Sequence, residues 1–207
     1  MLLPPTMHRQ GTGQGGTMDG NRRVATWMAA LLACMAAVTA HAASPKAGEV
    51  PPDLLGKTPK GEEIRISDHR GKVMVVSFWA SWCPQCRRKF PVLDYLQEQV
   101  DPEQLRVVVV NFKEDASTYR AVRRQARKSK VTWTHDRNGA VSDAYGVNAV
   151  PHTFIIDKTG KVAKVHLGYS ERSVPGLIAT LNELLAAPAA GDVAALDASS
   201  ATGSAGP

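Results

Sequence analysis

The sequence predicts an α/β protein in which helices flank a mixed central sheet. Two runs rich in β-branched and aromatic residues, 73–79 and 105–112, are continuous enough to be strands buried on both faces. A helical pattern follows each run, and two shorter strand patterns surround a glycine turn near residue 160. Two strand–helix units, then a hairpin and a final helix, give a sheet with parallel and antiparallel neighbours.

The first elements are arranged around the buried strand at residues 73–79. Before it, residues 54–67 alternate weakly and contain a strand candidate over 63–66. After it, a short link leads to Cys83, where a helix begins that should extend to about residue 100. The strand therefore delivers Cys83 to its C-terminal end, where α/β sheets place their functional sites.

The rest of the chain alternates between strand and helix patterns. The expected order is a strand over 105–112, a helix over 117–129, a loop entered through 131–133, a short helix over 140–145, strands over 153–157 and 162–167, and a helix over 174–187. The last helix should place five aliphatic residues on one side: Leu177, Ile178, Leu181, Leu184 and Leu185.

The helix expected over 117–129 is strongly basic, within a chain of formal net charge +6. Its apolar residues, Tyr119, Val122 and Ala126, recur at spacings of three and four. Such spacing buries one helix face and leaves the charged residues on the solvated face. The basic stretch is therefore interpreted as a solvated surface, and no nucleic-acid partner is expected.

Residues 1–42 are typical of an export signal. Arg22 and Arg23 precede an apolar stretch over 24–40, and Ala40-His41-Ala42 provides small residues before a cleavage point. Met18 is a second possible start of translation. Three alternatives stay open: an uncleaved membrane anchor, a lipoprotein site ending at Cys34, and a twin-arginine signal. In each of these alternatives the domain lies outside the cytoplasm, for example in the periplasm.

Residues 188–207 form a low-complexity tail without aromatic residues. It has too little apolar surface to offset the entropy lost on ordering, so we expect it to be disordered. This leaves residues 43–187 as one domain, large enough for a hydrophobic core.

If Cys34 leaves with the export signal, Cys83 and Cys86 are the two cysteines that remain. Three residues apart at the start of a helix, they share one face and can form a disulfide. A disulfide this local closes almost no loop and adds little stability in the loop-entropy account, which favours a chemical role. A structural zinc site would need four ligands, and there is no second Cys-x-x-Cys pair, so no metal is expected.

The surroundings of Cys83 favour a thiolate. Pro84 suits the first helical turn, which places Cys83 at the helix cap, facing unpaired backbone N–H groups and the positive end of the helix dipole. Thiolates are the attacking species in thiol–disulfide exchange. Arg87 and Lys89 would add positive charge, but we expect them on a solvated helix face, where their effect is small.

Two segments carry a resemblance to a known family. Residues 78–86, FWASWCPQC, are similar to the active-site segment of thioredoxin-like proteins, and residues 150–157, VPHTFIID, followed by Gly160, resemble their second signature. The similarity extends over residues 49–187 and includes the 111–115 segment of the TlpA/ResA-like branch. It implies a thioredoxin-like fold with an extra N-terminal β-hairpin. It also implies an exported thiol:disulfide oxidoreductase; some members of the branch serve cytochrome c maturation.

The resemblance also implies residue roles. Cys83 would be the exposed nucleophile and Cys86 the buried resolving thiol. Pro151 would follow a cis peptide bond, and Val150 would offer its backbone to an extended substrate. Trp79 and Trp82 would shape the surface around Cys83; simple packing is the alternative for both, and it is favoured more for Trp79 than for Trp82.

Two residues depart from the family pattern. Ser77 stands where thioredoxin has a buried aspartate, and Lys89 stands where many reductases of this branch have a glutamate. Losing a carboxylate and gaining a cation should stabilise thiolates, and therefore the reduced form. We expect a more oxidising disulfide than in typical relatives.

Three functions are therefore considered. The leading one is a reductase of protein disulfides, itself reduced by a membrane thiol electron donor, without a nicotinamide or flavin cofactor. The second is an oxidase or isomerase that uses the same residues. The third is a copper-handling protein in which Cys83, Cys86 and His152 hold Cu(I). In the first two cases His152 is interpreted as a half-exposed strand residue.

Overall fold

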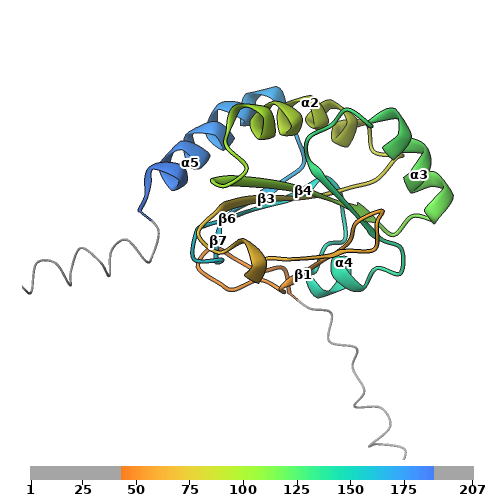
Figure 1. Ribbon diagram of the computed structural model, residues 1–207, viewed down its shortest axis with the longest axis horizontal. Helices are drawn as coiled ribbons and strands as arrows, with labels where there is room; N and C mark the ends of the chain where they lie inside the picture. Colours follow the sequence, from red (N-terminus) through yellow and green to blue (C-terminus); the bar gives the residue numbers. More distant parts are fainter. Residues whose placement is uncertain (1–42, 189–207) are drawn as a thin grey trace, which may run out of the picture. The chain divides into compact units, whose positions relative to one another are not determined.

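The computed structural model describes residues 43–188, whose helices and strands are shown in Figure 1. The strands are β1 (Leu54–Lys57), β2 (Glu63–Arg65), β3 (Val73–Trp79), β4 (Leu105–Phe112), β5 (Thr132–Asp136), β6 (His152–Ile156) and β7 (Val162–Leu167). The helices are α2 (Pro84–Gln99), α3 (Ala116–Gln125), α4 (Ala140–Ala144) and α5 (Val174–Ala186), with short 3-10 turns at Ser67–His69 and Glu171–Ser173.

Within these residues the seven strands form one mixed sheet, in the order β2-β1-β5-β4-β3-β6-β7. The central strands β3, β4 and β5 are parallel, whereas β6 runs antiparallel to β3 and β7 antiparallel to β6. At the other edge, β1 and β2 form the additional N-terminal hairpin that the resemblance implied. The predicted α/β class with a mixed sheet is confirmed.

The sheet has a hydrophobic core on each face because alternate residues of its central strands point in opposite directions. Val73, Val75 and Trp79 of β3 pack on the face covered by α2, α3 and α5. Met74, Val76 and Phe78 pack on the opposite face, with α4 and the β1–β2 hairpin. All seven residues of β3 are buried, as expected for a central strand covered on both sides.

Most elements lie where the sequence placed them, and β3, β4 and β7 have the predicted bounds. The prediction that residues 131–133 lead into a loop is wrong, because Thr132–Asp136 forms β5, paired with β4. The helix expected over 117–129 ends at Gln125. Ile178 is 37% exposed and is not part of the apolar side of α5, where Leu177 and Leu181 are buried.

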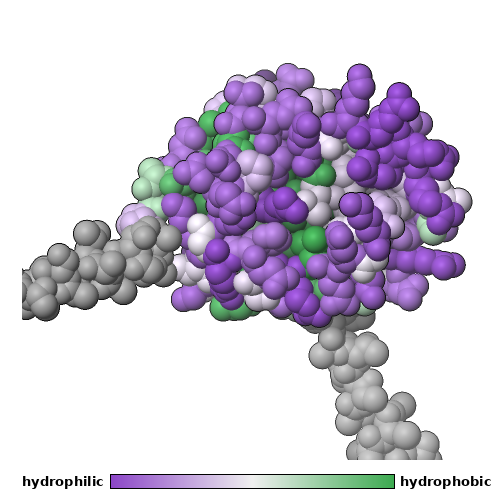
Figure 2. All heavy atoms as spheres, viewed as in Figure 1, coloured by the Kyte–Doolittle hydropathy of each residue, from purple (hydrophilic) through white to green (hydrophobic). Residues whose placement is uncertain are grey.

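The basic helix α3 packs as predicted. Tyr119 is buried, and Val122 and Ala126 contact the same hydrophobic core. Arg120 and Arg124 are exposed, and Figure 2 shows hydrophilic side chains over the region that α3 occupies in Figure 1. The prediction that all the charges of this helix are solvated is wrong at Arg123, which is half-buried with its guanidinium 5.8 Å from the centroid of the Trp133 ring.

The predicted export signal and low-complexity tail fall on residues 1–42 and 189–207, outside the described residues. Between residues 43 and 188, no helix has the length and apolar character needed to cross a membrane.

Candidate active site

The two cysteines occupy the N-terminus of α2, immediately beyond the C-terminal end of β3. Cys83 is the N-cap residue in an extended conformation, and Pro84 takes the first helical position. The backbone N–H of Cys86 donates a hydrogen bond to Cys83 Sγ over 3.1 Å. The two residues form a disulfide, with their Cα atoms 5.3 Å apart. The predicted capping position of Cys83 is confirmed, and the helix N-terminus stabilises negative charge on its sulfur.

In this disulfide state, exposure does not distinguish the two cysteines. Cys83 is 3% exposed and Cys86 is 2% exposed, so the expectation of an exposed Cys83 is wrong for this state. The cause is local packing: Cys83 Sγ is bonded to Cys86 and lies 3.6 Å from the carbonyl oxygen of Val150. What separates the cysteines is their position, since Cys83 caps the helix and Cys86 lies inside its first turn.

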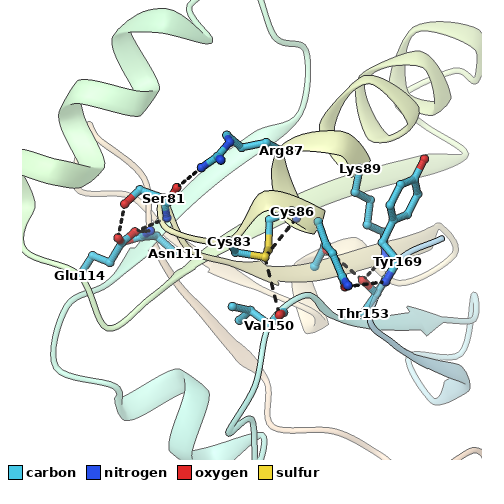
Figure 3. The surroundings of a disulfide bond; sticks show 12 residues. Ser81, Cys83, Cys86, Arg87, Lys89, Asn111, Glu114, Val150, Thr153 and Tyr169 are labelled. Carbon is cyan, nitrogen blue, oxygen red and sulfur yellow. Dashed lines mark hydrogen bonds between the residues drawn. A yellow bond between two sulfur atoms is a disulfide. The ribbon is translucent and has the colours of Figure 1, made fainter. Parts of the chain in front are cut away.

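A second loop closes over the cysteines at the start of β6. The Val150–Pro151 peptide bond is cis, as the resemblance implied. Pro151 is buried, and its carbonyl accepts a hydrogen bond of 2.8 Å from Gly168 N–H, just after β7. In the same segment after β7, Tyr169 N–H donates a hydrogen bond to Gln85 Oε1 over 3.3 Å. Figure 3 shows Val150 and Tyr169 on different sides of the cysteine pair.

The segment before Cys83 is fixed at Ser81 by two charged side chains. Glu114 accepts hydrogen bonds from the N–H and the hydroxyl of Ser81, over 2.9 and 2.5 Å. Arg87 donates to the Ser81 carbonyl over 2.7 Å, and Asn111 donates to Glu114 over 2.6 Å (Figure 3). No individual role is predicted for Asn111 or Glu114 from sequence alone. Their only signal was membership of the 111–115 segment.

The resemblance implied a surface role for both tryptophans beside the site, but the two behave differently. Trp79 is 1% exposed and packs edge-on against Phe90 and Trp133, with ring centroids 5.2 Å away in both cases. Trp82, directly before Cys83, is 62% exposed. Trp79 therefore belongs to the core, and Trp82 presents a large apolar surface next to the disulfide.

Lys89 does not lie on the solvated face of α2. It is 4% exposed, and its Nζ donates a hydrogen bond of 2.5 Å to Thr153 Oγ1. Thr153 Oγ1 in turn lies 2.9 Å from Ser77 Oγ, the position of the buried aspartate in thioredoxin. Burial lowers the pKa of Lys89 to about 8, because removal from water disfavours the ammonium form. The expectation of a solvated Lys89 is wrong.

His152 faces away from the cysteine helix. It is 4% exposed, so the expectation of a half-exposed residue is also wrong. Its ring stacks on Phe154 at 4.6 Å, within the hydrophobic core opposite α2, and neither ring nitrogen has a hydrogen-bond partner. Burial, and secondarily the charge of Lys89, lowers its pKa to about 4. Among the described residues no three His, Cys, Asp or Glu side chains converge, so the geometry does not support a copper site with His152.

The parallel strands deliver a capped cysteine pair to one sheet end, beside a cis-proline loop. Fold and site together define a thiol:disulfide oxidoreductase of the thioredoxin-like class. The family model described as Redoxin matches residues 45–181, which is more than half of the sequence, and the chain belongs to that family.

Individual proteins agree with this class. The chain is 34% identical to the thiol-disulfide oxidoreductase ResA of Geobacillus thermodenitrificans (strain NG80-2), over 58% of this chain and 69% of ResA. A structure from Chlorobium tepidum, assigned as thiol:disulfide interchange protein DsbE, is 30% identical, with a TM-score of 0.60 over 69% of this chain and 99% of that one. The exposed lipoprotein thioredoxin Etrx1 of Streptococcus pneumoniae (strain TIGR4) is 28% identical, with a TM-score of 0.52 over 64% and 98%.

Proposed function

We propose that this protein reduces disulfides in protein substrates outside the cytoplasmic membrane, with Cys83 as the attacking and Cys86 as the resolving thiol. The observation that carries the proposal is the placement of Cys83 Sγ. It caps α2, accepts the N–H of Cys86 and lies against the loop that contains cis-Pro151. This is an arrangement for stabilising a thiolate next to a substrate-binding backbone segment.

The reaction consists of two exchanges. Cys83 thiolate attacks one sulfur of the substrate disulfide; a Cys83–substrate bond forms, and the other substrate sulfur leaves as a thiolate. Cys86 then loses its proton and attacks Cys83 Sγ, which releases the second substrate thiolate and forms the Cys83–Cys86 disulfide. The substrate gains two electrons and the cysteine pair loses two.

The substrate would lie across Val150, Pro151 and Trp82. Cys83 already contacts the Val150 carbonyl, and an extended chain alongside this loop would bring its sulfur to the same point. The 62% exposed ring of Trp82 offers apolar contact, and Pro84 is exposed at the helix start. These residues form the proposed binding surface.

The location and the electron donor follow from the sequence and the chemistry. Residues 22–42 have the pattern of an export signal, which can also serve as a membrane anchor. Each cycle leaves the cysteines oxidised, and outside the cytoplasm soluble reductant is scarce. We therefore propose a membrane thiol electron donor and, as one class of substrate, the disulfides of proteins in cytochrome c maturation.

The same cysteines could instead oxidise or isomerise disulfides, and one observation favours this second candidate. Lys89 is buried on α2 one turn beyond Cys86, and as a cation it would favour the thiolate over the disulfide. The direction of the reaction depends on how far this effect raises the reduction potential.

The test is capture of the reaction intermediate. Cys86→Ala should accumulate a mixed disulfide between Cys83 and a protein substrate, and Cys83→Ala should not. The reduced wild-type protein should reduce a disulfide-bonded protein such as insulin, whereas both variants should lose turnover. Equal trapping by both single variants would refute the assigned roles. Oxidation of reduced, unfolded substrates without any reductase activity would support the second candidate.

A further inference from the structure

Lys89 places a buried amino group on α2. Of the lysines and arginines in residues 43–188, Lys89 is the one whose side chain is buried. Its Nζ forms no ion pair with any described carboxylate and donates its hydrogen bond to a neutral hydroxyl, Thr153 Oγ1. An ammonium ion without a carboxylate partner is poorly stabilised in such a site. The two thiol–disulfide exchanges described above do not use this side chain.

Lys89 and Cys86 lie on the same buried side of α2. They are three residues apart, which makes their side chains neighbours on a helix. Below them, Thr153 of β6 pairs directly with Ser77 of β3 and with His166 of β7. In Figure 3 the side chain of Lys89 extends from the helix toward Thr153. A short polar row in the sheet therefore lies beneath the turn of α2 that carries Cys86.

Loss of the Cys86 thiol proton is hindered at the resolving step. Its thiol must lose a proton before the sulfur can attack, yet the residue is 2% exposed and has little access to water. Thiols in apolar surroundings retain their protons because burial disfavours the thiolate. A buried base beside the sulfur would remove this obstacle.

We propose that Lys89 Nζ takes up the proton of Cys86 as Cys86 resolves the mixed disulfide. The neutral amine becomes an ammonium ion, and the Cys86–Cys83 bond forms. The Cys83–substrate bond breaks, and the substrate leaves as a thiolate with its electron pair. The ammonium ion later returns its proton to solvent. This inference rests on the proposed roles of Cys83 and Cys86.

The protonation behaviour of the surrounding groups agrees with the geometry. Burial lowers the pKa of Lys89 to about 8, so roughly a tenth of the side chain is neutral at neutral pH. His166 of β7 pairs with Thr153 on the side of the sheet that faces Lys89, whereas the ring of His152 lies on the opposite side of β6. Burial lowers the pKa of each imidazole. Neither imidazole would therefore compete for the proton above neutral pH.

The experiment separates the two exchanges in time. Reduced full-length protein carrying Cys34→Ala is mixed with an equimolar aromatic disulfide that releases a coloured thiolate at each step. The first phase reports attack by Cys83, and the second, concentration-independent phase reports attack by Cys86. Its rate is followed from about pH 5 to about pH 10, a range that brackets the expected titration of the amine.

Four variants define the outcome. Lys89→Met should slow the second phase at neutral pH by at least about tenfold and leave the first phase unchanged. Lys89→Arg should be similarly slow, because a guanidinium keeps its charge but cannot accept a proton. Thr153→Val retains the amine without its hydroxyl partner and should lower the midpoint of the second-phase pH profile. Arg88→Met, an exposed cation removed from the same helix, is the matched control and should change neither phase.

A wild-type second phase in Lys89→Met, or in Lys89→Arg, would overturn the proposal; in the second case positive charge alone would be sufficient. An unchanged rate of the first phase shows that Cys83 keeps its environment at the helix N-terminus, because the rate depends on the pKa and accessibility of the thiol. If Lys89→Arg changes that rate through overpacking, Lys89→Met and Thr153→Val decide the question. Failure of the proposed function is distinguishable, because then the wild type itself shows no second phase that depends on Cys86.

Discussion

Replacing Lys89 by methionine should stabilise the protein at neutral pH. The ammonium group is buried beside Thr153 without a carboxylate partner, and burial lowers its pKa from the ordinary value of 10.5 to about 8. A pKa difference of one between the unfolded and folded states corresponds to about 1.4 kcal/mol, so keeping this group protonated in the folded state costs about 3 kcal/mol. Losing the hydrogen bond to Thr153 offsets about 1 kcal/mol of the gain. We therefore expect Lys89→Met to raise the free energy of unfolding by about 2 kcal/mol at neutral pH.

The pH dependence identifies the cause. Between pH 8 and 10.5 the unfolded chain binds more protons at Lys89 than the folded protein does, so the wild type becomes more stable as pH rises through this window. The advantage of Lys89→Met is thus complete below about pH 8 and disappears above about pH 10.5. Urea unfolding of the oxidised proteins, followed by tryptophan fluorescence at both ends of the window, measures this difference.

Arg88→Met is the matched control, because Arg88 is an exposed cation on the same helix. Its free energy of unfolding should stay within about 0.5 kcal/mol of the wild type at both pH values. An unfolding free energy of Lys89→Met that is lower than wild type at neutral pH, or a difference that does not change with pH, would refute the reasoning.

Three further predictions follow from individual contacts. His152, with a pKa lowered to about 4, binds protons more weakly in the folded than in the unfolded state, so the wild type should lose up to about 3 kcal/mol as pH falls from 6.5 to 4. In urea titrations His152→Phe should not show this part of the loss; an unchanged loss would contradict the prediction. Glu114→Ala, which frees the N–H and hydroxyl of Ser81, should lower the free energy of unfolding by about 2 kcal/mol, against no change for exposed Glu183→Gln. Equal effects of these two changes would argue against the role of Glu114. Lys89→Glu should make the reduction potential of the cysteine pair more negative, measured against defined thiol buffers, and an unchanged potential would remove Lys89 as its cause.

The parts of the fold predicted well from sequence are those where burial leaves a strong pattern. Strands β3 and β4 consist almost entirely of apolar residues, and both faces are covered, so their bounds follow from the sequence. Strand β5 was missed because its buried positions include Thr134 and Asp136. Thr134 donates to the carbonyl of Leu55, and Asp136 accepts from Ser142. Only the folded chain brings these partners together.

In the candidate site, too, local features could be predicted from sequence, whereas contacts between distant residues could not. The cap position of Cys83 follows from local rules, because proline and the cysteine spacing fix the start of the helix. The spacing of residues along α2 does predict that Lys89 is buried. Cys86, Lys89, Leu93 and Leu96 recur at spacings of three and four, and all four are buried. Lysine is rarely buried without an ionic partner, so composition favoured the solvated face. The fixing of Ser81 by Glu114, 33 residues away, depends on tertiary structure.

The central claim is that the Cys83–Cys86 pair reduces disulfides, and its reduction potential tests this most directly. The full chain carrying Cys34→Ala is equilibrated against defined thiol–disulfide buffers and followed by its tryptophan fluorescence, to which Trp79 and Trp82 beside the cysteines contribute. A reductase should have a potential near or below the value of about −270 mV for thioredoxin. A potential approaching the value of about −120 mV for the oxidant DsbA would contradict the claim and assign the protein to disulfide oxidation or isomerisation.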